Sequence, residues 1–157
     1  MSTSNGSQAA DPPRTAYLVK RLESALRSRL DAAVKPYGLT ATQYTALAAL
    51  RTSPGQSSAQ LARRSFVSAQ TMQEMVVALE RRGLVSRAPS PTNRRVLRID
   101  LSARGEAILR DLDDEVDDIE QAMLADLEPQ HVETLRHALR VCARRLAEQA
   151  TAPQPPQ

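Results

Sequence analysis

The chain has 157 residues, of which 41% are hydrophobic, and a formal net charge of +3 at pH 7. This size suffices for one compact domain with a core, and a single cysteine excludes an internal disulfide framework. No apolar run approaches the roughly 20 residues that a membrane span needs, so we expect a cytoplasmic protein without a membrane partner.

The first predicted helix runs from Ala16 to about Lys35. Residues 1–13 precede it as a flexible polar arm, because they lack the apolar core of a signal peptide. Apolar side chains then recur at helical spacing until Pro36-Tyr37-Gly38 ends the pattern. At the other end of the chain, the proline-rich residues 151–157 are expected to form a disordered tail.

Two capping boxes predict the next two helices. In T-x-x-Q and S-x-x-Q, the hydroxyl and the amide side chain each satisfy a backbone N–H at the helix start. Thr40 with Gln43 opens a helix that extends to about Arg51. Ser57 with Gln60 opens a shorter one that ends near Ser65.

A fourth helix is predicted from the N-cap Ser68 to Arg82, with Gly83 ending it. Val67 is placed to pack against Met72 at the helix start. The apolar stripe of this helix consists of Met72, Met75, Val76 and Leu79.

The opposite face of this helix carries polar side chains suited to reading bases. Glutamine can pair bidentately with adenine, and small hydroxyl residues contact bases or phosphates in the major groove. Together with Ser57 on the preceding helix, the predicted DNA-contacting residues here are Ser68, Gln70, Thr71, Gln73 and Glu74.

Two strand-like runs follow, Leu84–Pro89 and Arg95–Leu101, joined by a turn. In the second run, alternate residues Leu97, Ile99 and Leu101 are expected to pack on the helices. The turn ends in Arg94, next to Arg95. An arginine on a protruding hairpin can enter the minor groove, so both join the predicted DNA contacts.

Charge is distributed unevenly along the chain. Residues 51–110 hold eleven Lys/Arg and four Asp/Glu, whereas residues 111–128 hold none and nine. The basic middle would attract phosphate and the acidic block would be repelled by it. This pattern predicts which part of the chain faces double-stranded DNA.

Two further helices are predicted near the C-terminus, the last beginning at Glu128-Pro129. Each carries an apolar stripe, and we expect them to interlock with the first helix in a homodimer. Cys142 lies on the second stripe and is expected in a core, whereas His131 and His137 are expected on the surface. The stripes are Ile108, Leu112, Val116, Ile119, Met123 and Leu127, then Val132, Leu135, Leu139, Cys142 and Leu146.

An acidic face lies on the first of these two helices. It is either a solvated surface or one side of an ion-pair network with the last helix. The acidic residues are Asp113, Asp114, Asp117 and Asp118, and their possible partners are Arg136, Arg140 and Arg144.

From about Tyr17 to Leu146 the chain resembles the MarR family of bacterial regulators. The motifs that carry the resemblance are LTATQY, PGQSSAQLARR, VSAQTMQEMVVALERRGLV and the wing followed by LSARG. The resemblance implies a mainly α fold with a small β wing: a winged helix-turn-helix lobe at 39–103 and a helical dimerisation region at 14–38 and 104–150. It also implies a pocket for a small molecule between the two.

Two residues depart from the family pattern. Where wings of the family often carry Asp-x-Arg, this chain has Asn93-Arg94-Arg95, so the arginine loses a charged partner. Glu74 stands where many members have a basic residue. A carboxylate weakens phosphate contact and could accept from cytosine instead.

The predicted effector site rests on the three tyrosines of the chain, which lie in or beside the first two helices. Phenolic rings suit flat, weakly acidic ligands, and an arginine could neutralise a carboxylate. Alternatively, the tyrosines simply pack between lobes. The candidate residues are Tyr17, Arg21, Tyr37, Tyr44 and Arg51.

The sequence contains no phosphate-binding loop, metal-ligand cluster or paired nucleophile and base, so no enzyme activity, catalytic residue, metal or cofactor is predicted. The expected function is a dimeric repressor that a small aromatic or phenolic ligand releases from an inverted-repeat operator. The alternatives are a winged-helix module for protein–protein contact and a DNA-binding protein that responds to no ligand.

Overall fold

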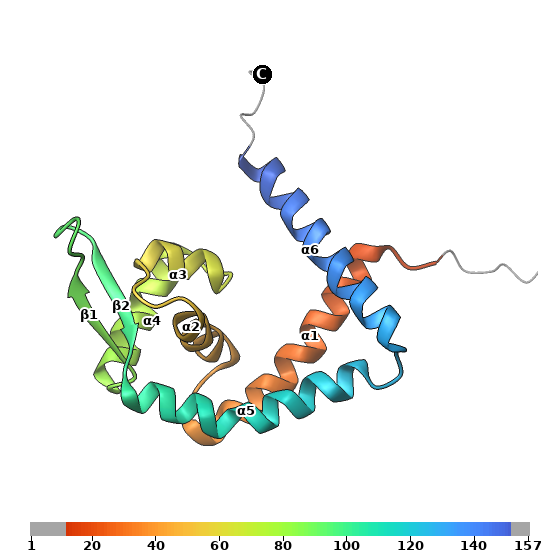
Figure 1. Ribbon diagram of the computed structural model, residues 1–157, viewed down its shortest axis with the longest axis horizontal. Coiled ribbons are helices and arrows are strands. Elements are labelled where there is room, and N and C mark those ends of the chain that lie inside the picture. Colours follow the sequence, from red (N-terminus) through yellow and green to blue (C-terminus); the bar gives the residue numbers. More distant parts are fainter. Residues whose placement is uncertain (1–11, 152–157) are drawn as a thin grey trace, which may run out of the picture. The chain divides into compact units, whose positions relative to one another are not determined.

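The computed structural model describes residues 12–151, which form a mainly helical fold with one small sheet, as predicted (Figure 1). Most of the predicted arm and tail lies outside the described residues, but Thr151 is the last residue of a helix, so the predicted tail began one residue early. The elements are α1 (Thr15–Val34), the 3-10 helix η1 (Lys35–Tyr37), α2 (Ala41–Thr52), α3 (Ser58–Arg64), α4 (Ala69–Arg81), β1 (Val85–Pro89), β2 (Leu97–Leu101), α5 (Ala103–Leu124) and α6 (Pro129–Thr151).

The chain divides into two compact units, one that ends at Ile119 and one that begins at Glu120. The first unit contains α1 to α4, both strands and most of α5. The second contains the end of α5 and all of α6. None of the helices within residues 12–151 combines the length and the apolar character that crossing a membrane requires.

Local capping fixes where the short helices begin. Thr40 accepts a hydrogen bond from the Gln43 backbone N–H at 3.2 Å while the Gln43 side chain accepts one from the Thr40 backbone N–H at 3.0 Å. Ser57 and Gln60 form the same reciprocal pair at the start of α3. Both capping boxes are therefore confirmed, and α2 and α3 start within one residue of their predicted positions.

Three helix ends close with the same left-handed turn, but only two of them use glycine. Gly38 and Gly83 end η1 and α4 with φ values of 64° and 69°. Phe66 ends α3 with φ 59°, and the following Val67 N–H reaches back to the Ala62 carbonyl at 3.1 Å. A side chain at this position crowds the carbonyl oxygen that follows it, so phenylalanine costs free energy that glycine would not.

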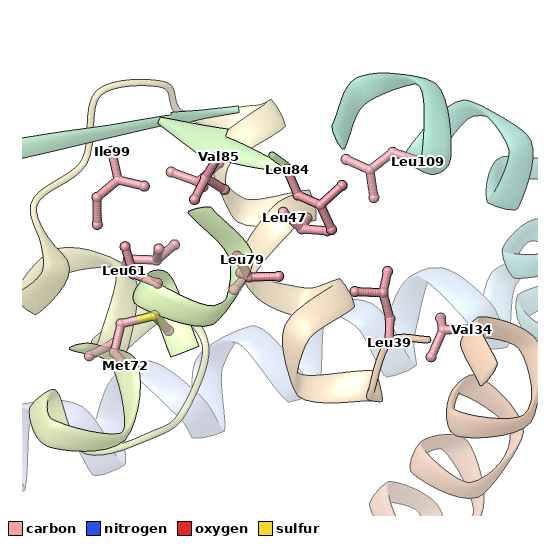
Figure 2. Close-up of a cluster of buried hydrophobic side chains, with 14 of the residues drawn as sticks. Val34, Leu39, Leu47, Leu61, Met72, Leu79, Leu84, Val85, Ile99 and Leu109 are labelled. Carbon is pink, nitrogen blue, oxygen red and sulfur yellow. The ribbon is translucent and has the colours of Figure 1, made fainter. Parts of the chain in front are cut away.

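The core of the first unit lies between α2, α3, α4, the strands and the start of α5 (Figure 2). Met72, Val76 and Leu79 are buried on α4, and the half-buried Met75 packs beside them, which confirms the predicted stripe. Val67 is partly buried against the same cluster. The core thus fixes α4 by its apolar face and leaves the opposite face free.

The two strands pair antiparallel, with Val85 opposite Leu101, Arg87 opposite Ile99 and Pro89 opposite Leu97. Ile99 is buried as predicted, but Leu97 is 44% exposed, so its predicted packing is wrong. Leu97 ends the ladder beside the connecting turn. That turn is also longer than predicted, because Val96 bonds back to Asn93 and delays the second strand to Leu97.

A tight junction joins the wing, the end of α4 and the start of α5. The Ser102 hydroxyl donates to the Gly83 carbonyl at 2.6 Å and accepts from the Gly105 backbone N–H at 3.0 Å. A Cβ at Gly105 would lie 2.3 Å from the carbonyl oxygen of Leu84. Glycine is therefore what lets the first turn of α5 pack against this backbone.

A second link connects the C-terminal end of α4 to the corner between α1 and α2. The guanidinium of Arg82 donates to the carbonyl of Gly38 at 2.7 Å and to that of Tyr37 at 2.6 Å. Hydrogen bonds from a charged donor are stronger than neutral ones. The position of α4 is thereby fixed relative to the α1–α2 corner as well as to the core.

Candidate nucleic-acid interface

The exposed face of α4 begins at a well-formed N-cap. The Ser68 hydroxyl accepts a hydrogen bond from the Thr71 backbone N–H at 3.1 Å and lies 2.8 Å from the Thr71 hydroxyl. Both side chains are exposed, as are those of Gln70, Gln73 and Glu74. A rigid first turn with an uninterrupted polar face is the geometry that a base-reading helix needs.

Glu74 acts on this face through its neighbour. The Gln70 amide nitrogen lies 3.4 Å from a Glu74 carboxylate oxygen, one helical turn away. A carboxylate that holds this NH2 group orients the amide and leaves the carbonyl oxygen of Gln70 pointing elsewhere as an acceptor. The carboxylate of Glu74 is thus hydrogen-bonded to Gln70, which is predicted to read a base.

The wing presents Arg94 and Arg95 as exposed side chains. The Asn93 side-chain oxygen accepts a hydrogen bond from the Arg95 backbone N–H at 3.1 Å. Asparagine therefore shapes the turn through the arginine's backbone, and its neutral amide contributes no charge to the guanidinium.

A cleft of about 540 Å³ brings together residues from three elements: Ser57 at the start of α3, Gln73 on α4 and Arg95 on the wing. Its floor is apolar and includes Val76 and Ile99. The other predicted DNA-contacting residues lie outside this lining, on the first turns of α4 and on the wing turn. α3, α4 and the wing thus each contribute a polar side chain to the lining of this cleft.

Sequence reasoning missed Arg87, which lines the same cleft. Its Nε donates to a Glu80 carboxylate oxygen at 2.9 Å, and this hydrogen bond lowers the pKa of the Glu80 carboxyl. The pair links α4 to β1. Its charge is the signal that could have revealed it, because Arg87 is an exposed cation on the strand that leads into the wing turn.

Of the two alternatives for the acidic face, the solvated surface fits Asp114, Asp117 and Asp118, which are exposed, whereas the ion-pair network with the last helix has other partners. Asp113 is held by Arg51 through two hydrogen bonds of 3.0 and 2.8 Å, and this bidentate contact lowers the pKa of the Asp113 carboxyl. Arg136 instead pairs with Glu120 and Glu133. The reason is that α2 brings a guanidinium to α5, a contact across 62 residues that spacing along one helix cannot show.

The five predicted effector residues lie in different surroundings. Tyr17 is 57% exposed at the start of α1, with the Arg21 guanidinium 5.9 Å from its ring centre. Tyr37 and Tyr44 pack half-buried against the core, and burial raises the pKa of the Tyr44 phenol. Arg51 is engaged by Asp113. The structure thus does not gather the five around one cavity, and their effector role stays a prediction.

The remaining candidate groups are on the surface. His131 and His137 are exposed, as predicted. Cys142 is also exposed, so its predicted core position is wrong within one chain, because much of the apolar stripe of α6 around it is uncovered. In the part of the chain that the structure describes, no group of three or more His, Cys, Asp or Glu could hold a metal ion.

Comparison with known proteins agrees with this geometry. The MarR family model matches residues 37–96, which span α2 to the wing turn. The HTH-type transcriptional repressor Rv2887 of Mycobacterium tuberculosis is 40% identical over 101 residues, which cover 64% of this chain and 73% of that protein.

Solved structures of the same mycobacterial protein share the fold. Its complex with salicylic acid superposes with a TM-score of 0.68 at 34% identity and covers 85% of this chain and 98% of that chain. Its complex with DNA gives a TM-score of 0.66 at 30% identity, with 83% and 98% covered. The helices and wing that form the cleft here are thus elements of a known DNA-binding architecture.

Proposed function

The chain belongs to the MarR family of transcriptional regulators, and on that basis we propose that it is a dimeric repressor, released from an inverted-repeat operator by a small aromatic or phenolic ligand. The observation that carries the DNA-binding role is the exposed polar face of α4, which begins at the Ser68 N-cap. Gln73 of this face and Arg95 of the wing line the same cleft. In this proposal α4 enters the major groove and the wing follows the adjacent minor groove.

The proposed role of each residue follows from its place. Gln70 and Gln73 would read base edges from the first turns of α4, with Ser68 and Thr71 beside them. Ser57 would hold a phosphate at the start of α3. Arg94 and Arg95 would contact the backbone or the minor groove, and they supply affinity more than sequence preference.

The proposed dimer rests on apolar side chains that the described chain leaves exposed. On α1, Tyr17, Leu18 and Val19 are each about half exposed, between 45% and 57%. Leu139 and Leu146 on α6 are 40% and 68% exposed. Clusters of this kind on helices normally mark association surfaces, and we propose that a second copy of the chain covers them.

The relatives supply the ligand part of the proposal. The mycobacterial protein Rv2887 has been solved in complex with salicylic acid and, in another structure, in complex with DNA. Its alignments with this chain give 34% and 30% identity. We extend both partners to this chain. A regulator of this kind carries out no chemical step and acts on the chromosome, so we propose a non-enzymatic cytoplasmic protein.

The test of this function is binding to an inverted-repeat duplex as a dimer. We expect the half-site centres to lie about one helical turn, roughly 34 Å, apart, because each protomer contributes one recognition helix across a two-fold axis. Sedimentation at micromolar concentration and gel shifts with one or two half-sites measure this. A monomer that binds a single half-site tightly would contradict the proposal.

Replacing Arg95 by alanine is expected to weaken binding to specific and random duplexes alike. Because the guanidinium neutralises phosphate charge, the slope of log K against log salt should become shallower by about one unit. Arg29→Ala is the matched control, since Arg29 is an exposed cation on α1. An unchanged slope in Arg95→Ala, or an equal change in the control, would remove the wing from the interface.

A further inference from the structure

Besides apolar packing, three features join α1 to the lobe formed by α2, α3, α4 and the wing. The chain itself turns the corner through η1 and ends it at Gly38, whose φ is 64°. Near the end of α1, the Asp31 carboxylate accepts a hydrogen bond from the Ala41 backbone N–H at 2.7 Å, which ties α1 to the start of α2. Arg82, at the end of α4, supplies the third feature, so the recognition helix is bonded directly to this corner.

The two bonds from Arg82 fix an orientation as well as a distance. Nη1 donates to the Gly38 carbonyl at 2.7 Å, and Nη2 donates to the Tyr37 carbonyl at 2.6 Å. A guanidinium is planar and rigid, so two bonds to consecutive carbonyls hold it in one orientation, whereas a single bond would leave it free to turn. Both carbonyls lie at the C-terminal end of η1, where the helix supplies no N–H for them. Arg82 therefore constrains the angle between the end of α4 and the α1 corner.

The fold of the lobe itself rests on other contacts. Gly38 is exposed, and Tyr37 and Arg82 are half-buried, so water can bind the two carbonyls when the guanidinium is absent. The apolar face of α4 keeps its place in the core through Met72 and Leu79. Replacing Arg82 should therefore leave the lobe folded and loosen its attachment to α1.

A small rotation at this joint displaces the reading face by a distance that matters on DNA. Gln70 lies about three helical turns from Arg82, roughly 18 Å along α4. Turning α4 by about 5° about its Arg82 end therefore moves Gln70 by about 1.6 Å. In a two-fold dimer both copies move, so their separation changes by about 3 Å along the duplex, close to the roughly 3.4 Å of one base-pair step.

We propose that Arg82 is a positioning residue that selects the spacing between operator half-sites. The proposed dimer holds α1 through its exposed residues, which include Tyr17, Leu18 and Val19. Arg82 in turn holds α4 at one angle to the α1 corner, so the two recognition helices keep a fixed separation. The inference rests on the proposed function and adds to it the residue that sets operator geometry. Arg82 contacts no base, because both of its terminal nitrogens donate to main-chain carbonyls.

The experiment measures the affinity of the intact protein for duplexes that differ only in half-site spacing. The starting duplex is the tightest binder selected from a random pool, and the series inserts or removes one or two base pairs between its half-sites. Each base pair shifts one half-site by about 3.4 Å and turns it by roughly 35° about the duplex axis. We therefore expect the wild type to lose about tenfold or more in affinity for a change of one base pair.

Arg82→Met removes both donors and keeps a long side chain with good helix propensity. We expect its loss for a change of one base pair to fall to about threefold or less, because a looser joint lets the recognition helices follow the shifted half-sites. Arg81→Met is the matched control, since it removes the adjacent exposed cation and should leave the spacing profile as steep as in the wild type. Arg82→Lys keeps the charge and can still donate, so it should recover part of the discrimination.

The spacing profile separates positioning from a general loss of structure. Partial unfolding lowers the affinity for every duplex by the same factor, so the ratio between spacings does not change. An Arg82→Met profile as steep as that of the wild type, or an equally flattened profile in Arg81→Met, would overturn the inference and leave the proposed function intact. A wild type that tolerates every spacing equally would do the same. If the wild type binds no inverted repeat as a dimer, the proposed function fails and this inference fails with it.

Discussion

Replacing Gly105 by alanine is expected to lower the free energy of unfolding by about 3 kcal/mol, near the upper end of what overpacking costs. The new Cβ would lie 2.3 Å from the Leu84 carbonyl oxygen and 2.8 Å from Cδ1 of Leu101. The nearer neighbour is a backbone carbonyl oxygen, which cannot rotate out of the way as the end of the leucine side chain can. The clash would push α5 away from the junction where Ser102 also binds Gly83.

Gly83→Ala is the matched control for this prediction. Gly83 has a φ of 69°, but a Cβ at this position would meet no atom of the described chain within 4 Å. Alanine there should therefore cost only the roughly 1–2 kcal/mol of left-handed strain. Urea unfolding of both variants measures the difference. A smaller loss in Gly105→Ala than in Gly83→Ala would show that α5 shifts freely at the junction.

Gln70→Ala is expected to cost about 1–3 kcal/mol of binding free energy on the preferred operator and far less on random duplex, as expected for a lost bidentate base contact. Gln70 is exposed on the first turn of α4, and Glu74 holds its amide nitrogen. Competition binding against operator and random DNA measures both losses.

Two further variants are measured beside Gln70→Ala, one as a control and one to test the charge of Glu74. Gln121→Ala removes an exposed glutamine from α5 and should leave both affinities unchanged. Glu74→Gln removes the charge beside Gln70 and should raise affinity for random duplex, because a carboxylate repels phosphate. Equal losses on operator and random DNA for Gln70→Ala would exclude it from base reading.

Signals within a few residues were sufficient to predict where the helices α2, α3 and α4 begin. The two capping boxes and the Ser68 N-cap act over three residues, so the starts of α2, α3 and α4 follow from the sequence. The apolar stripe of α4 is equally local. Such short-range features define the boundaries of the recognition helix without any tertiary contact.

Contacts between distant residues could not be predicted in this way. The Arg51–Asp113 pair spans 62 residues, and the bonds from Arg82 to Tyr37 and Gly38 span 45 and 44. Leu97 has the right alternation for packing but lies at the turn end of the hairpin. Periodicity shows which residues share a face, whereas the partner of that face depends on the fold.

The turn between α3 and α4 illustrates the same limit. Phe66 has a left-handed backbone conformation there, and the preceding Ser65 hydroxyl is buried at the end of α3. Neither property follows from residue type, since phenylalanine at that place in the sequence gives no indication of a left-handed turn.

The anchoring of Arg82 has a consequence for redesigning this protein. The two groups that accept hydrogen bonds from Arg82 are main-chain carbonyls, so these bonds do not depend on the side chain at position 37. Glycine is needed at position 38 only because its φ is 64°. If α4 reads bases as proposed, the exposed residues at 70, 71, 73 and 74 can be exchanged for a new operator while the buried Met72 is kept. Grafts that retain Ser68, Met72 and Arg82 keep both ends of the helix and its core contact in place.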